Sequence, residues 1–139
     1  MLRFSSWWAQ SGLVLVQTGA CRAGLAAGRH GRQATARRIF ALLAGQGHPP
    51  SLFHLGCLFE QGQGGPVDVV SAGLHYRRAA LLGHAHAQYH LARLYAAGQG
   101  FMQDPLQAQY WFRQAARRRR ATGALSSSPV CAENASCRI

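Results

Sequence analysis

Two stretches of the sequence decide the fold: SLFHLGCLFEQGQGGPVDVVSAGLHYRRAA at residues 51–80 and AQYHLARLYAAGQGFMQDPLQAQYWFRQAA at residues 87–116. Aligned without gaps at an offset of 36 residues, they are identical at eleven of thirty positions, and three further positions exchange one aromatic residue for another. A shared Gly-Gln-Gly sequence, a shared aspartate and a shared pair of alanines fall in register. A period of this length is typical of repeat proteins in which each unit is one supersecondary motif.

Each unit is expected to fold as two α-helices joined by a glycine-containing turn. In the second unit, Leu91, Leu94 and Tyr95 follow helical spacing and predict an apolar stripe on a first helix. Gly98 would end this helix, because glycine readily adopts the left-handed cap conformation. Asp104 precedes a proline and predicts the start of a second helix, since its side chain can cap the free backbone N–H groups there. The apolar stripe of the second helix is Ala108, Trp111, Phe112 and Ala115.

A weaker copy of the unit precedes the two clear ones. Residues 34–48 align with the second helix of the last unit at an offset of 72 residues, twice the period. The turn between the two helices of this first copy is expected to be about two residues shorter than in the clear units. We divide the chain into an N-terminal segment that is disordered or serves targeting, a degenerate first repeat, two clear repeats and a disordered tail: residues 1–12, 13–48, 49–84, 85–120 and 121–139. Three units are close to the minimum for a stable stack, because each buries its apolar face only against a neighbour.

A resemblance to a known family lies in residues 83–116, GHAHAQYHLARLYAAGQGFMQDPLQAQYWFRQAA. This stretch resembles the Sel-1-like repeat, a relative of the tetratricopeptide repeat, whose unit has an alanine-rich first helix, a Gly-x-Gly turn, an aspartate and a second helix with two adjacent aromatic residues. Residues 51–83 are similar, although His75 stands at the position of Trp111 and Gly65-Pro66 alters the turn. The resemblance implies an all-α fold, an α/α superhelical solenoid of helix-turn-helix repeats, and a role in protein–protein contacts.

The composition is strongly basic and poor in acids. Of 139 residues, fifteen are arginine, none is lysine and four are acidic, which gives a formal charge of +11 at pH 7. A hydrophobic content of 48% excludes a chain that is disordered throughout, and no apolar run reaches the roughly 18 residues of a membrane-spanning helix. Four cysteines without a Cys-x-x-Cys pair exclude a disulfide scaffold, although Cys131 and Cys137 could pair in an oxidising compartment.

Two groups of residues could carry chemistry, and neither is complete. His86 and His90 are four residues apart on one helical face, but the neighbouring sequence supplies no further cysteine or carboxylate ligand for zinc. Cys57 lies three residues after His54, as in a thiolate–imidazole pair, but no acid follows that would orient the histidine. We therefore expect no catalytic residues, no metal and no cofactor.

One line of side chains is predicted to face a partner. In stacked helical hairpins, the first helices of the units line the inner, concave surface. His86, His90 and Arg93 are spaced i, i+4 and i+7 on such a helix, and three residues occupy the same line one unit earlier. The candidate partner-binding set is His54, Cys57, Gln61, His86, His90 and Arg93, with Cys57 expected to be partly exposed. An ordinary solvated face is the alternative interpretation.

A basic patch extends the last helix and consists of Arg117, Arg118, Arg119 and Arg120. It is either a solvated helix end, which the helix dipole favours, or a surface for nucleic acid, acidic protein or anionic lipid. No nucleic-acid-binding motif accompanies it.

The sequence as a whole indicates a non-catalytic adaptor or scaffold that presents its concave surface to a protein or peptide, expected to be acidic. The alternative is an arginine-rich protein associated with nucleic acid. The sequence is also compatible with a homo-oligomer. The sequence leaves the compartment open: it favours the cytoplasm, and export or a mitochondrial location is the alternative if residues 1–12 are a targeting segment.

Overall fold

The structure, a computed structural model, describes the backbone of residues 3–122 and the side chains of residues 16–121. Six α-helices make up this part of the chain: α1 (Arg3–Arg29), α2 (Gln33–Gly45), α3 (Pro49–Gln61), α4 (Val69–Leu81), α5 (Ala85–Ala97) and α6 (Pro105–Thr122). No strand occurs within the described residues. The predicted all-α fold is therefore confirmed.

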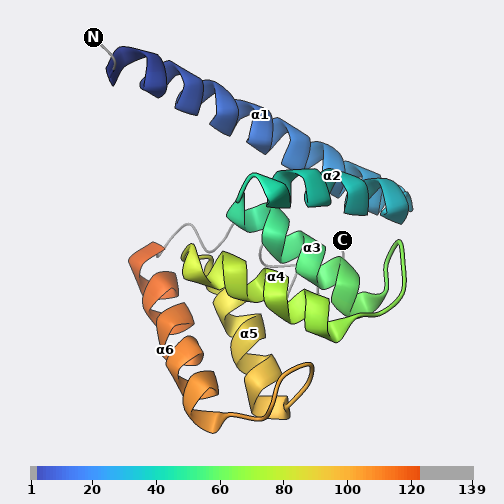
Figure 1. Ribbon diagram of the computed structural model, residues 1–139, viewed down its shortest axis with the longest axis vertical. Helices are drawn as coiled ribbons and strands as arrows, with labels where there is room; N and C mark the ends of the chain where they lie inside the picture. The colour runs from blue at the N-terminus through green and yellow to red at the C-terminus, as the bar shows by residue number, and fades with distance from the viewer. Residues whose placement is uncertain (1–2, 123–139) are drawn as a thin grey trace.

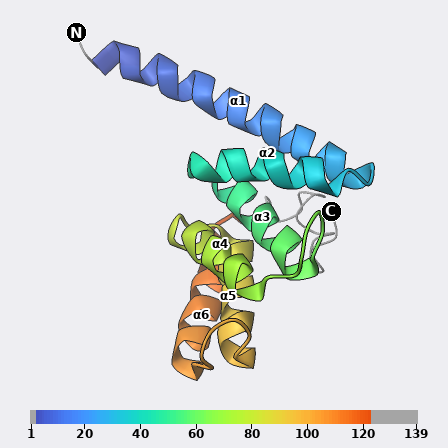
Figure 2. The same ribbon diagram turned by 45° about the vertical axis from the view of Figure 1, so that its right-hand side comes forward.

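The helices form three consecutive pairs stacked one on the next (Figure 1). Each helix packs mainly against the helices before and after it in the sequence. Two views that differ by 45° show the pairs following one another from α1 and α2 at one end to α5 and α6 at the other (Figure 2). The molecule is thus built as a repeat stack, in which a unit contacts only its neighbours.

The turns inside the two clear units are built alike. α3 and α5 are each thirteen residues long and are followed by the C-cap residues Gly62 and Gly98, whose φ angles are both 67°. Asp68 and Asp104 directly precede α4 and α6, and their carboxylates accept hydrogen bonds from backbone N–H groups of the first helical turn. The glycine ends and aspartate starts predicted from the sequence are confirmed.

The first helical pair departs from the clear units. α1 is 27 residues long and begins at Arg3, so the boundary expected after residue 12 falls inside a helix. No proline and no aspartate in this stretch would stop the helix or begin a new one. The turn to α2 spans residues 30–32, whereas the turn between α3 and α4 spans residues 62–68. It is therefore four residues shorter, not two, because it lacks the Gly-x-Gly sequence and a capping aspartate. Residues 123–139, with Cys131 and Cys137, lie outside the described residues.

The core between the second and third units is a cluster of rings centred on Phe53 of α3. Four imidazoles have their ring centroids 5.0 to 6.0 Å from that of Phe53: His54, His84, His86 and His90. The Tyr76 ring of α4 lies 5.8 Å away from the same centre. Trp111, predicted to be a core residue, is buried in the apolar core of α5 and α6.

Burial keeps two of these imidazoles neutral. It lowers the pKa of His54 to about 4, and repulsion by His48 and His86 acts in the same direction. The pKa of His84 falls to about 3, chiefly through burial. The Nδ1 atom of His84 also accepts a hydrogen bond from the Ala87 N–H at the start of α5, and only an unprotonated nitrogen can accept it.

We expect the fold to lose stability as the pH falls below the ordinary histidine pKa of about 6.5. In that range the unfolded chain binds protons that the buried imidazoles do not, so unfolding becomes more favourable until the pH reaches the pKa of His54 near 4. Each such histidine contributes a loss of up to about 1.4 kcal/mol per pH unit. Urea unfolding at about pH 7.5 and about pH 5, followed by circular dichroism, measures the effect.

Two variants serve as controls for this pH dependence. His54→Leu removes one buried imidazole and should make the dependence shallower, whereas His30→Gln changes an exposed residue and should leave it intact. Equal unfolding free energies at the two pH values would contradict the burial of neutral imidazoles.

A matched pair of glycine substitutions tests the helix ends. Gly98→Ala should lower the free energy of unfolding by about 1 kcal/mol or more, because an L-residue at this positive φ is strained. Gly45→Ala, at a helical position where a Cβ meets no atom within 4 Å, should be neutral or stabilising by up to about 1 kcal/mol. Thermal melting of both variants decides the point; equal melting temperatures would refute the strain at Gly98.

Candidate functional site

The six predicted partner-binding residues do not share one accessible surface. Three are buried, with exposed fractions of 6% for His54, 1% for Cys57 and 3% for His90. The other three are half-buried: Gln61, His86 and Arg93. The expectation that Cys57 is partly exposed is therefore wrong.

The burial follows from the position of α3 between two units. All residues from Ser51 to Leu58 are buried. On the side of α2, the Phe40 ring stacks on His54 with centroids 5.2 Å apart, and on the side of α4 the Tyr76 hydroxyl lies 3.4 Å from the Cys57 sulfur. The prediction considered the apolar stripe of one unit and left out the surfaces that neighbouring units cover. For this reason it wrongly placed Cys57 on an exposed face.

Glu60 joins three helices through its carboxylate. The Tyr76 hydroxyl of α4 donates to its Oε2 atom over 2.6 Å, and Arg93 of α5 donates to its Oε1 atom over 2.9 Å. His90 Nδ1 lies 3.7 Å from Oε2. Burial by itself disfavours the charge, but hydrogen bonds from His90 and Tyr76 and the charges of His90 and Arg93 outweigh it and lower the pKa of Glu60. The carboxylate thus fixes the second unit to the third.

Sequence reasoning missed this role of Glu60. The available signal was its position, because the equivalent residue one period later is Ala96, and an acid is rare in this chain. Glu60 also forms an ion pair with Arg93. Arg93, one of the predicted partner-binding residues, is therefore already paired with a carboxylate of its own chain.

The described residues show no metal centre and no spanning helix. Within them, no three His, Cys, Asp or Glu side chains are grouped so as to hold a metal ion. Burial raises the pKa of the Cys21 thiol, and a hydrogen bond with Ser51 has a smaller, opposing effect. The raised pKa disfavours the reactive thiolate. No helix in the described part is long and apolar enough to cross a membrane.

The α5–α6 end of the stack exposes apolar side chains whose counterparts one unit earlier are buried. Phe53 is 3% exposed, but its counterpart Tyr89 is 39% exposed; Tyr76 is 0% exposed, but its counterpart Phe112 is 36% exposed. The rings of Tyr89 and Phe112 meet edge to face, with centroids 5.5 Å apart. We call this surface the end face, and define it by Tyr89, Ala96, Gln109, Phe112 and Ala116, which are all exposed.

A groove of about 690 Å³ runs between the end of α5 and α6 on the end face. Ala96, Gln109, Phe112 and Ala116 of the end face line it, and Arg113 lies at its edge. In the preceding unit, the side chains equivalent to Phe112 and Ala116 are covered by the next helix. The end face is therefore a stacking surface that no described element covers.

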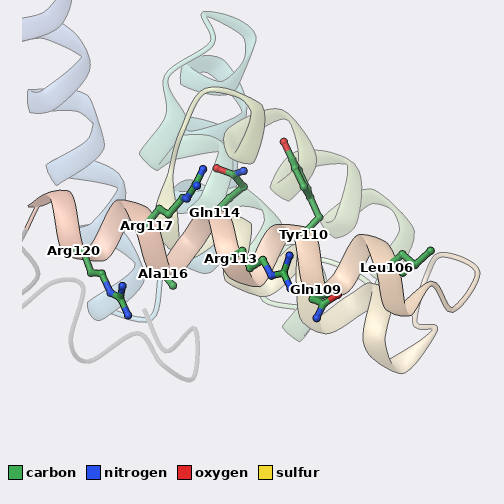
Figure 3. Close-up of a pocket in the computed structure, with 8 residues that line it drawn as sticks. All are labelled: Leu106, Gln109, Tyr110, Arg113, Gln114, Ala116, Arg117 and Arg120. Atoms are coloured by element: carbon green, nitrogen blue, oxygen red, sulfur yellow. The ribbon is translucent and has the colours of Figure 1, made fainter.

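Three exposed arginines follow one another along the outer side of α6 (Figure 3). Arg113, Arg117 and Arg120 are spaced i, i+4 and i+7, which places them on one helical face. Together with Leu106 and Tyr110 they line a hollow of about 490 Å³. We call these three arginines the basic face.

The four arginines of the predicted basic patch do not all lie on one surface. Arg117 and Arg120 belong to the basic face. The guanidinium of Arg118 lies so near Gly83 that a Cβ there would be 2.7 Å from it, and that of Arg119 lies over the Tyr89 ring, 5.8 Å from its centroid. Consecutive residues of a helix point in different directions, so the run is divided between two surfaces.

The fold uses the described acids internally. Glu60 accepts hydrogen bonds from Tyr76 and Arg93, and Asp68 and Asp104 cap helices. None of these three carboxylates lines the hollow beside the basic face. Among the described residues, the hollow beside the basic face thus has no carboxylate in its lining.

Comparison with known proteins connects this architecture to a family. The Sel1 repeat profile matches residues 49–84 and 85–119. A crystal structure of a Sel1 repeat protein from Oxalobacter formigenes superposes with a TM-score of 0.70 and 26% identity, over 79% of this chain and 48% of that one. The crystal structure of c5321, a protective antigen present in uropathogenic Escherichia coli strains and displaying an SLR fold, superposes with a TM-score of 0.68 and 26% identity, over 89% of this chain and 29% of that one.

The present chain thus spans less than half the length of either solved structure. No curated protein sequence matches it. The family profile covers both clear units and leaves the first helical pair unmatched, so the degenerate first repeat at residues 13–48 stays a prediction. With more than half of its residues matched as two successive units, and with the same fold in two solved relatives, the chain belongs to the Sel1 repeat family.

Proposed function

We propose that the protein is a non-catalytic adaptor that binds a protein or peptide at its end face and basic face. The main support is the exposure of Tyr89 and Phe112 at positions where the preceding unit buries Phe53 and Tyr76. Phe112 lines the groove together with Arg113, and Tyr89 contacts the Phe112 ring. Aromatic side chains and arginine are enriched at the centre of protein interfaces. Stacked helical repeats commonly offer such extended surfaces to partners.

This surface replaces most of the concave set as the proposed contact. The buried members of that set cannot touch a partner, and Arg93 is engaged by Glu60. Gln61 and His86 remain accessible in part, so they are candidates for peripheral contacts.

The partner is proposed to be acidic. The basic face gathers three of the fifteen arginines of a chain whose formal charge is +11, and no described carboxylate lines its hollow. Attraction of this kind steers an oppositely charged protein and accelerates its association. Nucleic acid would be attracted by the same arginines, but it would not require the apolar groove beside them.

A matched pair of substitutions separates the core from the binding surface. Tyr76→Ala should lower the free energy of unfolding by about 3–5 kcal/mol or prevent folding, because it empties a fully buried site. Phe112→Ala, the equivalent change one period later, should cost no more than about 1 kcal/mol because the ring is exposed. Urea unfolding measures both, and an equal loss in the two variants would show that the end face is covered.

Site-directed photo-crosslinking tests the proposed function. A photoreactive amino acid at position 112 should form adducts with a discrete protein in the source cells. The same amino acid at position 42, where Leu42 is exposed on α2, should not. Adducts that nuclease removes, or the same protein adducts at both positions, would contradict an adaptor that binds through its end face.

A further inference from the structure

We propose that the segment bound at the end face is a single acidic, amphipathic α-helix, which stacks there as α5 stacks on the preceding unit. This inference rests on the proposed function and specifies the shape and charge of the bound segment.

The chain itself shows how such a face is covered. Ala87 of α5 is fully buried, so a small side chain lies at the contact. Gln88 of the same helix donates from its Nε2 atom to the carbonyl oxygen of Ala80 on α4, over 3.1 Å. The residue equivalent to Ala80 at the end face is Ala116, which is exposed. The end face therefore resembles the surface of the preceding unit that α5 covers. A helix with a small residue at its point of contact could pack there in the same way.

Backbone hydrogen bonding also favours a helix over an extended peptide. The end face lies on α5 and α6, whose backbone groups are largely paired within the helices. An extended segment bound to the end face would form no sheet-like hydrogen bonds with it. Its backbone groups would lose their hydrogen bonds to water and gain none in return. A helical segment satisfies its own backbone and can bury an apolar stripe in the groove of about 690 Å³.

The charge of the segment follows from a difference between α4 and α6. At the outer positions of α4 stand Leu74, Arg77 and Leu81, and the equivalent positions of α6 hold Tyr110, Arg113 and Arg117. Arg120 extends the line by one further turn. Between the second and third units, Glu60 on the covered side pairs with Arg93 on the incoming helix. The α4 positions stay exposed beside the stacked α5, so the arginines border the surface that an incoming helix would cover, and Arg113 also lines its groove. Carboxylates on the flank of the incoming helix would face these arginines.

Two occupants from this chain fit the charge less well. The first helix of a second copy, α1, carries Arg3, Arg22 and Arg29 and no acid, so it would bring like charge to the basic face. Residues 123–139 contain one acid, Glu133, and one base, Arg138, so they bring no net negative charge. An acidic helix from another protein is the occupant that the charges favour.

Three synthetic peptides of about 18 residues test the inference with the full-length protein, since isolated helices much shorter than this are marginal. The Glu peptide has alanine and leucine on one helical face and glutamates spaced i, i+4 and i+7 beside it. The Lys peptide replaces the glutamates with lysine, and the Pro peptide keeps the glutamates but has a central proline that breaks the helix. Fluorescence anisotropy of the labelled peptides should show binding of the Glu peptide, about tenfold or more weaker binding of the Pro peptide and none of the Lys peptide.

Matched arginine variants locate the binding. The triple variant R113Q/R117Q/R120Q should weaken binding of the Glu peptide by about tenfold or more. The triple variant R22Q/R38Q/R77Q removes the same charge from three other exposed positions and should change it little. Phe112→Ala should also weaken binding, and melting curves check that each variant is folded.

Each contrary result overturns a stated part of the inference. Equal affinity for the Glu and Pro peptides would exclude a helix, and equal loss in the two triple variants would exclude the basic face. Irradiation of the purified protein with the photoreactive residue at position 112 should give no internal link; a link to residues 123–139 or to a second copy would name that segment as the occupant. Protein adducts at position 112 in cells, without binding of the Glu peptide, would refute the acidic helix and leave the adaptor function standing.

Discussion

Helix α3 has no solvent-facing side between Ser51 and Leu58. The neighbouring helices pack around this segment and bury it. α2 stacks Phe40 on one side, α4 brings Tyr76 to another, and α5 closes the cluster of imidazoles round Phe53. A helical pair alone cannot bury two apolar faces. Each unit therefore leaves one apolar face that the next unit must cover. The exposed end face on α5 and α6 is the place where that requirement is left unmet within the described residues.

Much of the fold could be predicted from the sequence because its signals are local. Gly98 and Asp104 act within one helical turn, and the period of 36 residues repeats them at Gly62 and Asp68. The first pair could be predicted only in outline. Its turn lacks these signals, so neither the three-residue connection nor the continuation of α1 back to Arg3 followed from the pattern.

The candidate site was less predictable because it depends on contacts between units. Helical spacing shows which residues of one unit share a face, but Cys57 and His54 are buried by helices from neighbouring pairs. Glu60 and Arg93 are 33 residues apart and meet only when the second unit stacks on the third. The spacing of Arg113 and Arg117 is visible in the sequence, but the predicted patch followed the run of consecutive arginines, whose side chains the fold divides between two surfaces.

Because each helix packs mainly against its neighbours in sequence, the chain can fold in local steps and does not need to close long loops first. Glu60 and the ring cluster join α3, α4 and α5 at the centre of the stack. Among the described helices, α1 and α6 pack mainly against one neighbour each, and less supported helices open more easily. The proposed binding surface lies on α6, the last described helix, so local unfolding of α6 would compete with occupancy, and a bound partner would slow the exchange of its backbone amide protons with solvent.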